Sequence, residues 1–454
     1  MTFRTLSQTV GIPALLVSGV VLAKASSGSA ADPAAVERAL DRFLSAPSRA
    51  AAQPLIKGVV ESGATFDQAY ARLKRGRSYA QPVPLGLQRL KRRTSDGLEH
   101  TYALVVPDDY TPKRSYQVRV QLHGGIARRT AEPGREGIDR IPGTRDQIAV
   151  YPNGWVEAMW WFGNQVENIN GIVDELKRLY NVDENRVYLT GISDGATGAY
   201  FFALRDTTPW SSFLPLNGHM AVLANPDTAA DGELHPGNAV NKPFFIVNGG
   251  QDRLYPTRSV DPYVEHLRKI GTTVVYHPRP DAGHNVEWWP MERDGFEQFL
   301  VDHPRDPLPD RLSWETERTD RYNRAHWLVI DELGTVAGES GLDDTNLIDR
   351  GLIVRELYPR RKVSGRVDLV RKGNTVEVST RGVRALSLLV SPDTFDFAAP
   401  LKVMTNGHVA FEGKLEKSLA TLLKWSARDN DRTMLFGAEV SVRVKIGQKI
   451  EDRR

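Results

Sequence analysis

A serine between two glycines is the first feature of this sequence that suggests chemistry. Residues 191–195 read Gly-Ile-Ser-Asp-Gly and follow directly on the apolar, strand-like run 186–190. A nucleophile on a sharp strand-to-helix turn needs small neighbours, because the backbone is strained there and the helix packs close to the strand. This spacing is typical of an activated Ser193, although an ordinary glycine-rich turn would also account for it.

A serine nucleophile needs a base that removes its proton, and His284 is the best candidate among the ten histidines. It lies in a loop sequence, Asp-Ala-Gly-His, after a strand-like run that ends near His277. His219 also follows a strand-like run and is kept as the alternative base. His266 and His303 fall within or at the end of expected helices, so structural roles are expected for them.

An acidic side chain must orient the base, and Asp252 has the most suitable position. It follows the apolar run 244–248 through a Gly-Gly-Gln turn, at the end of a strand where parallel sheets place their sites. Asp261 and Asp281 are the alternatives. Asp261 precedes Pro262 and is expected to cap a helix, whereas Asp281 is expected in a turn.

The oxyanion that forms during acyl transfer needs backbone N–H donors near the serine. One is expected from Asp194, the residue after the nucleophile. The other is expected from Gly124 or Gly125, which follow the strand-like run 116–122 and allow close approach of the backbone to a substrate. His123, just before them, is expected to brace this loop rather than to transfer protons.

Two pairs of tryptophans lie near these landmarks and are candidates for a substrate pocket. Trp160 and Trp161 precede a phenylalanine, and Trp288 and Trp289 follow His284 closely. Core packing is the alternative, because most tryptophans are buried and adjacent side chains point in different directions.

The elements that would position these residues alternate between strands and helices. Such alternation predicts an α/β fold, with a mainly parallel sheet covered by helices on both faces. Strands are expected over 85–90, 100–106, 116–122, 148–151, 186–190, 213–216, 244–248 and 272–277, and helices over 166–180, 196–205, 262–270 and 287–302.

Outside this region the pattern changes twice. Residues 33–80 are expected to form amphipathic helices, ahead of the catalytic domain over 85–305. Three prolines between 304 and 309 suggest a linker, after which short strands and turns predict a small β-rich accessory domain over 310–450. One helix, 415–427, interrupts these strands.

Composition excludes several classes of function. The 454 residues include 59 Lys and Arg against 56 Asp and Glu, and no long basic run, which argues against a nucleic-acid partner. The chain has no cysteine, which excludes disulfides, thiolate metal sites and a cysteine nucleophile.

The N-terminal residues predict the compartment. Arg4 precedes an apolar stretch, Val10 to Ala23, that ends in small residues suited to cleavage. At about 14 residues the stretch is shorter than the roughly 20 that span a bilayer. We therefore expect a signal peptide over 1–25 and a secreted or periplasmic protein without stable membrane insertion, and an uncleaved anchor is the alternative.

The order Ser193, Asp252, His284, with His-Gly-Gly at 123–125 upstream, resembles the α/β-hydrolase superfamily over about residues 85–305. The segments 186–195 and 250–252 look like those of secreted esterases of the feruloyl-esterase and polyhydroxyalkanoate-depolymerase kind. The catalytic domain of prolyl oligopeptidases is also similar. The resemblance implies an eight-stranded sheet, a serine hydrolase mechanism, and no metal or cofactor.

On this basis the sequence predicts hydrolysis of a small-molecule or polymeric carboxylic ester through an acyl-enzyme on Ser193. A serine peptidase with the same triad is one alternative, weakened because no β-propeller is recognisable in the chain. A binding protein that keeps the hydrolase fold without turnover is the other.

Overall fold

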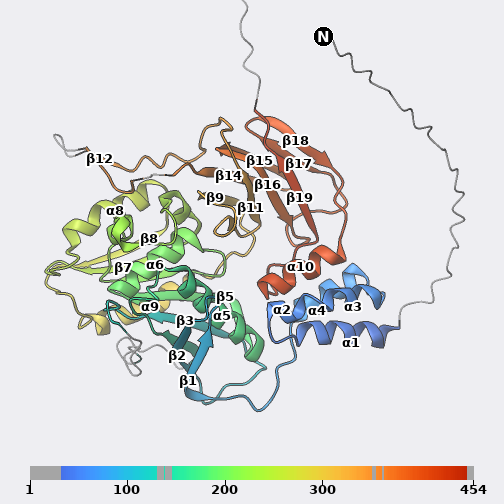
Figure 1. Ribbon diagram of the computed structural model, residues 1–454, viewed down its shortest axis with the longest axis horizontal. Coiled ribbons are helices and arrows are strands. Elements are labelled where there is room, and N and C mark those ends of the chain that lie inside the picture. The colour runs from blue at the N-terminus through green and yellow to red at the C-terminus, as the bar shows by residue number, and fades with distance from the viewer. Residues whose placement is uncertain (1–31, 130–137, 139–145, 350–353, 360–361, 447–454) are drawn as a thin grey trace, which may run out of the picture.

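The computed structural model describes residues 32–129, 138, 146–349, 354–359 and 362–446 (Figure 1). The expected signal peptide therefore lies outside the described residues. Within the described ranges, no helix is both long enough and apolar enough to cross a membrane.

The largest element is an eight-stranded sheet with the order β1-β2-β4-β3-β5-β6-β7-β8. β2 runs antiparallel to both neighbours, and the pairs from β4 to β8 are parallel. This confirms the predicted fold class. The strands are β1 (Gly86–Arg93), β2 (Glu99–Val106), β3 (Tyr116–Leu122), β4 (Gln147–Pro152), β5 (Val182–Ile192), β6 (Phe213–Leu216), β7 (Phe244–Gly249) and β8 (Val274–Arg279).

Helices cover both faces of this sheet because its central strands are apolar on both sides. On β7, Phe244 and Ile246 pack into the core that includes α5, α6 and α8, whereas Phe245 and Val247 pack against α9. The helices are α5 (Gly163–Leu179), α6 (Asp194–Arg205), the short α7 (Ala221–Ala224), α8 (Thr257–Lys269) and α9 (Trp289–Asp302), with 3-10 turns η1 (Pro226–Thr228) and η2 (Pro236–Asn241).

Helix α8 begins earlier than the sequence suggests. Pro262 lies inside it, and the helix starts at Thr257. Asp261 is therefore not the N-cap, and its carboxylate instead accepts a hydrogen bond of 2.8 Å from the Tyr276 hydroxyl.

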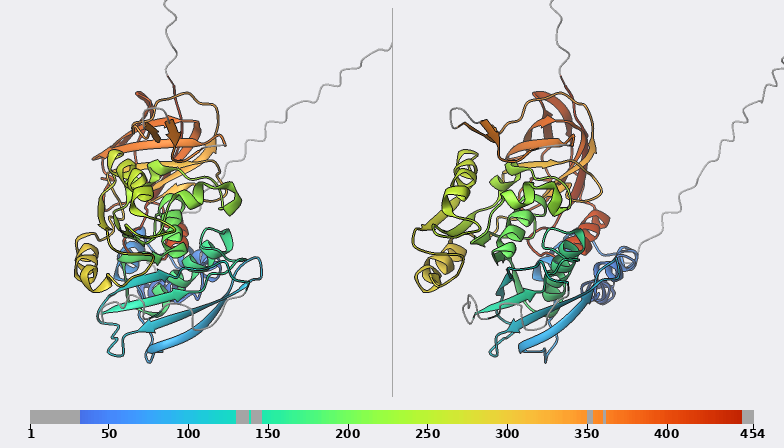
Figure 2. Two further views of the ribbon diagram at one scale, coloured as in Figure 1. Left: turned by 90° about the vertical axis from the view of Figure 1, so that its left-hand side faces the viewer. Right: turned by 60° about the vertical axis from the view of Figure 1, so that its left-hand side comes forward.

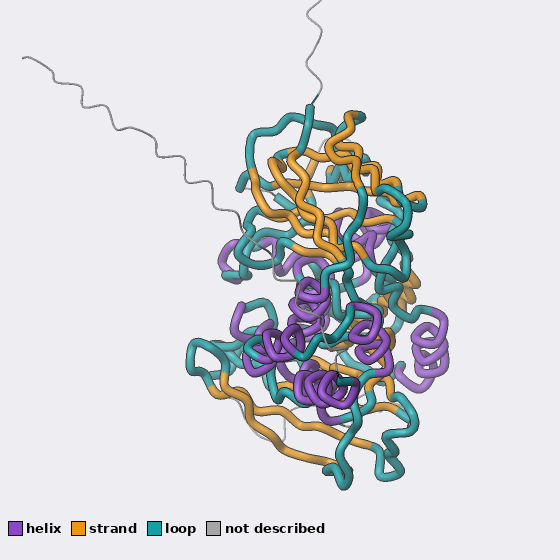
Figure 3. Tube along the Cα trace, turned by 90° about the vertical axis from the view of Figure 1, so that its right-hand side faces the viewer, coloured by secondary structure: helices purple, strands orange, loops and turns teal. Residues whose placement is uncertain are grey.

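The C-terminal part is built from two packed sheets that share one core, and their strands are the orange ones in the upper part of Figure 3. One sheet joins β10 (Arg324–Ala325), β11 (Leu328–Leu333), β16 (Val383–Val390) and β19 (Ala438–Arg443). The other joins β18 (His408–Gly413), β17 (Leu401–Thr405), β15 (Thr375–Arg381), β14 (Gly365–Lys372) and β9 (Arg311–Thr316), and β12 (Leu347–Asp349) pairs separately with β13 (Val354–Glu356).

The N-terminal helices pack against a helix from the far end of the chain. α10 (Leu419–Asp429) contributes Leu422 and Leu423 to the core that holds Val36 and Leu40 of the first helix (Figures 1 and 2). The helix expected to interrupt the accessory strands thus completes a helical cluster with α1 (Pro33–Leu44), α2 (Arg49–Ala52), α3 (Leu55–Glu61) and α4 (Phe66–Arg75).

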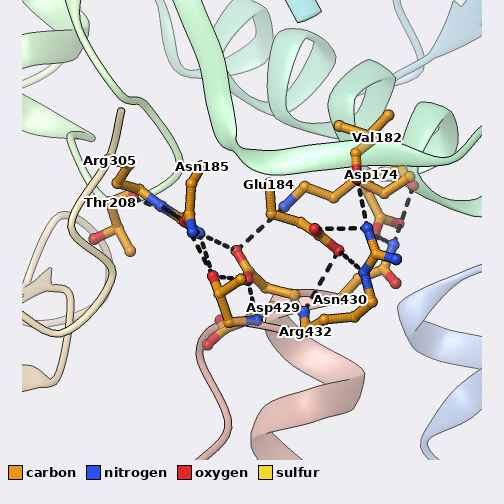
Figure 4. Close-up of polar contacts among 12 residues, drawn as sticks. Asp174, Val182, Glu184, Asn185, Thr208, Arg305, Asp429, Asn430 and Arg432 are labelled. Atoms are coloured by element: carbon orange, nitrogen blue, oxygen red, sulfur yellow. Dashed lines mark hydrogen bonds and ion pairs between the residues drawn. The ribbon is translucent and has the colours of Figure 1, made fainter. Parts of the chain in front are cut away.

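Buried polar contacts join these parts, as Figure 4 shows. Arg305, 4% exposed, donates to Asp431 at 2.7 Å and to Asn185 at 2.9 Å. Arg432 donates to Glu184 at 2.7 Å. The proline-containing segment expected to be a linker is therefore packed, at Arg305, into the junction between the sheet and the C-terminal part.

Candidate active site

Ser193 occupies the sharp turn between β5 and α6. Its φ of 57° and ψ of −119° place it in a region that residues with side chains rarely adopt. A Cβ on Gly191 would lie 2.1 Å from the Gly195 carbonyl oxygen, and one on Gly195 would lie 2.1 Å from the Leu122 carbonyl oxygen. Both flanking glycines are therefore needed for this turn.

Three loops bring Ser193, His284 and Asp252 into one line of hydrogen bonds. His284 Nε2 lies 2.9 Å from Ser193 Oγ, and His284 Nδ1 lies 2.6 Å from Asp252 Oδ2. The other carboxylate oxygen of Asp252 accepts from the N–H groups of Leu254 and Tyr255 at 2.8 and 2.9 Å. A histidine that donates from Nδ1 to this carboxylate keeps Nε2 free to accept the serine proton.

The alternative residues have other partners. His219 Nδ1 accepts from the Ala221 N–H at 3.0 Å, and its ring lies beside those of Tyr255 and Tyr263. The carboxylate of Asp281 is at an exposed turn. The structure thus places His284 and Asp252, and not these residues, beside Ser193.

The loop after β3 lies directly over the serine. A Cβ on Gly124 would be 2.8 Å from Ser193 Cβ, so only glycine fits, and Gly125 has a φ of +67°. Within the described part of the chain, the N–H groups of Gly124, Gly125 and Asp194 have no hydrogen-bond partner. They are therefore available as donors to an oxyanion.

His123 fixes the orientation of this loop. Its Nε2 accepts from the Gly154 N–H at 3.0 Å, so Nδ1 carries the hydrogen and donates to the Gly124 carbonyl at 2.9 Å. Because the C=O and N–H of one peptide unit point in opposite directions, this bond also sets the direction of the Gly125 N–H. Asp194 adds a second bond, since its carboxylate accepts from the Ile126 N–H at 3.0 Å.

The four tryptophans are buried. Trp160 is 0% exposed and donates from Nε1 to the His123 carbonyl at 3.0 Å, behind the loop. Trp161, Trp288 and Trp289 are 3–5% exposed and belong to the two cores that flank the sheet. Core packing thus accounts for their surroundings, and the pocket role remains a sequence prediction.

Two asparagines that sequence analysis did not single out tether the site's loops. Asn217, at the end of β6, donates from Nδ2 to the Asn285 carbonyl at 2.5 Å, next to His284. Asn248, near the end of β7, donates to the Gly218 carbonyl at 3.1 Å. Both are 0% exposed. The signal in the sequence that could have identified them is a polar residue at the carboxyl end of each of two apolar strands.

Tyr255 supports the same cluster. Its ring contacts that of His284 edge-on, with centroids 5.8 Å apart. Burial, with smaller effects from the carboxylates of Asp194 and Asp252, raises the pKa of Tyr255 to about 12. The phenol therefore stays protonated at neutral pH. Among the residues described, no group of three His, Asp or Glu is placed to hold a metal ion.

The strand order and the position of Ser193 together identify the fold. Ser193 lies on the turn after β5, and a glycine-containing loop after β3 faces it. The chain has the α/β-hydrolase fold. In this sheet, β6, β7 and β8 end at the loops that carry Asn217, Asp252 and His284.

Comparisons with known proteins give distant similarities. No family model matches the chain. A bifunctional acetylxylan esterase/xylanase of Neocallimastix patriciarum is 22% identical over 182 residues, which are 39% of this chain. The matched region spans about a quarter of the length of that curated relative.

Solved structures of hydrolases match about half of the chain. A thermostable esterase is 20% identical, with a TM-score of 0.38, over 48% of this chain and 63% of its own. Thermogutta terrifontis esterase 2 is 14% identical, with a TM-score of 0.41, over 50% of this chain and 97% of its own. Pyrococcus horikoshii acylaminoacyl peptidase is 16% identical, with a TM-score of 0.39, over 50% of this chain and 43% of its own.

Proposed function

We propose that this α/β-hydrolase cleaves a carboxylic ester through an acyl-enzyme on Ser193. The observation that carries the proposal is the line of hydrogen bonds from Ser193 through His284 to Asp252. A serine hydroxyl is a weak nucleophile until a neighbouring base removes its proton, and Asp252 stabilises the imidazolium that results.

In the proposed first step, Ser193 Oγ bonds to the ester carbonyl carbon while His284 Nε2 takes the serine proton. The carbonyl oxygen becomes an oxyanion, to which the N–H groups of Asp194 and of Gly124 or Gly125 donate. The ester C–O bond then breaks, and His284 returns its proton to the leaving alkoxide. Water, deprotonated by His284, then attacks the acyl-serine; the bond between the acyl carbon and Ser193 Oγ breaks, His284 returns the proton to Oγ, and the acid is released.

Two observations suggest which substrates to test first. The name of the Neocallimastix patriciarum relative suggests an acetylated polysaccharide as one class to test. A polymeric ester would also suit a secreted or periplasmic enzyme, which the N-terminal sequence predicts.

A matched panel of esters and amides tests the proposal. We expect the protein to hydrolyse 4-nitrophenyl acetate faster than 4-nitroacetanilide, and acetylated xylan faster than peptides. The Ser193→Ala variant should lose this activity. A preference for amides would favour the peptidase alternative. Full activity in Ser193→Ala, or no turnover of any ester or amide by the folded protein, would contradict the proposal.

A further inference from the structure

One arginine lies against the loop that faces the serine. Arg128 Nη2 is 3.4 Å from the position that a Cβ on Gly125 would occupy, on the loop whose N–H groups are the candidate oxyanion donors. The Arg128 side chain is half-buried. In the parts of the chain that the structure describes, it has no hydrogen bond or ion pair.

Both backbone polar groups of Arg128 are hydrogen-bonded, which fixes the position of this residue. The Arg128 N–H donates to the Ile126 carbonyl at 2.7 Å, and the Arg128 carbonyl accepts from the Val156 N–H at 2.8 Å. Ile126 in turn donates to the Asp194 carboxylate at 3.0 Å. The guanidinium is therefore carried by a segment that is bonded to the residue next to Ser193.

The acidic side chains of the site are already engaged. Asp252 is bonded to His284 and to two backbone N–H groups, and Asp194 is bonded to Ile126. A guanidinium is always charged, and its planar set of N–H donors matches a carboxylate in a two-pronged pair. Partial burial without a partner is unfavourable for a charge, so an anion that reached Arg128 would gain strong hydrogen bonds.

We propose that Arg128 is a specificity residue that binds a carboxylate carried by the acid or the alcohol part of the ester. This inference rests on the proposed esterase function and adds the class of substrate: esters with a negative charge near the scissile bond. The oxyanion has its own donors in the backbone N–H groups, so Arg128 is expected to select the substrate rather than to assist the chemical step.

Matched pairs of esters test this proposal. Mono-4-nitrophenyl adipate and 4-nitrophenyl hexanoate differ only in a terminal carboxylate on the acyl chain. For the alcohol side, 4-acetoxybenzoate and 4-acetoxybenzamide differ by the same kind of charge. Removing charge-assisted hydrogen bonds in Arg128→Gln should lower kcat/KM for the anionic ester of at least one pair about tenfold or more, and that for its neutral partner less than about twofold.

The matched control is Arg129→Gln, which removes the same charge one residue further on, where the side chain is exposed. It should leave both members of each pair within about twofold of the wild type. Raising NaCl to about 0.5 M should weaken the wild-type preference for the anionic ester but not the turnover of the neutral one.

Two results would overturn the proposal. One is an Arg128→Gln variant that keeps wild-type ratios for both pairs, and the other is an equal loss for neutral and anionic esters, which would indicate a role in the chemical step or in folding. Failure of the proposed function is distinguishable, since the wild type would then hydrolyse none of the four esters.

Discussion

At the scale of single residues, the backbone of Ser193 determines what its neighbours must be. Its positive φ turns the chain so tightly that Gly191 and Gly195 approach carbonyl oxygens at distances no Cβ could tolerate. Gly124 completes this arrangement from another strand, because its missing side chain leaves room for the serine. Three glycines, from β5, α6 and the loop after β3, thus keep the hydroxyl accessible.

Gly124→Ala tests this arrangement. A methyl group 2.8 Å from Ser193 Cβ should displace the loop and its N–H donors, and kcat/KM should fall by roughly two to three orders of magnitude, as for loss of an oxyanion donor. Initial rates with a 4-nitrophenyl ester measure the loss, and circular dichroism checks the fold.

Gly295→Ala is the matched control for that change. Gly295 lies within α9, and a Cβ there has no neighbour within 4 Å. Activity should stay at the wild-type level, and stability should rise by up to about 1 kcal/mol because alanine favours a helix. An active Gly124→Ala variant would contradict the role assigned to the loop.

The three side chains that the sequence selected do meet, because each follows a strand of one parallel sheet and such strands end at a common edge. The sequence could not predict the tethers among their loops. Asn217 and Asn248 resemble any polar residue that ends a strand, and their partners are backbone carbonyls of loops distant in sequence. Such contacts depend on how three loops meet.

At the scale of elements, these tethers connect the loops after β6, β7 and β8. We expect Asn217→Ala and Asn248→Ala to lower kcat about tenfold to a hundredfold, because small displacements of His284 or Asp252 weaken proton transfer. Steady-state kinetics and the rate of inactivation by a fluorophosphonate measure the effect.

Asn241→Ala is the control for general loss of stability. Like the two tether residues, Asn241 donates a hydrogen bond to a backbone carbonyl, that of Ser313, at 2.6 Å. It lies, however, at the junction with the C-terminal sheets and not beside Ser193. It should lower the melting temperature while kcat stays unchanged. If the two tether variants lost only thermal stability, as this control does, a positioning role would be ruled out.

Element boundaries show where local patterns were insufficient. All eight strands of the main sheet were predicted from strand-like runs. The central parallel strands gave the clearest pattern because they are buried on both faces, whereas the antiparallel edge strand β1 alternates between half-buried and exposed residues. The start of α8 was misplaced because Pro262 is tolerated inside that helix. The partner of α10 was not predictable, since its apolar face packs against helices more than 340 residues earlier in the chain.

At the scale of the whole molecule, buried charges bind the eight-stranded sheet to the C-terminal part. Arg205, at the end of α6, makes two 2.7 Å hydrogen bonds to Glu317, and His235 makes a third contact of 2.8 Å. The side chains of Arg205 and Glu317 are 1% and 2% exposed. These contacts make the C-terminal part a structural component of the folded chain and not a freely attached module.

Glu317 should make this junction sensitive to acid. Burial alone would raise the pKa of Glu317, but hydrogen bonds to His235 and Arg205 hold it well below its usual range. A carboxylate with a lowered folded-state pKa stabilises the protein above its unfolded pKa of about 4.3, and this stabilisation is lost as the pH falls below that value.

Urea unfolding at pH 7, 5 and 3 measures this contribution. In Glu317→Gln the free energy of unfolding at pH 7 should be lower by about 3 kcal/mol, because Arg205 is left buried without its charge partner. The free energy of unfolding of this variant should also fall less steeply between pH 7 and pH 3 than that of the wild type. The exposed Glu339→Gln serves as control and should follow the wild type. Identical pH dependence in all three proteins would contradict this role for Glu317.

Active-site labelling tests the central claim most directly. A fluorophosphonate probe reacts with a serine only when a base activates it, and mass spectrometry of the digested protein identifies the modified residue. We predict one equivalent of label per chain, on Ser193, and none on folded Ser193→Ala. Absence of label on the folded wild-type protein, or label on another residue, would contradict the assignment of Ser193, His284 and Asp252 as the catalytic machinery.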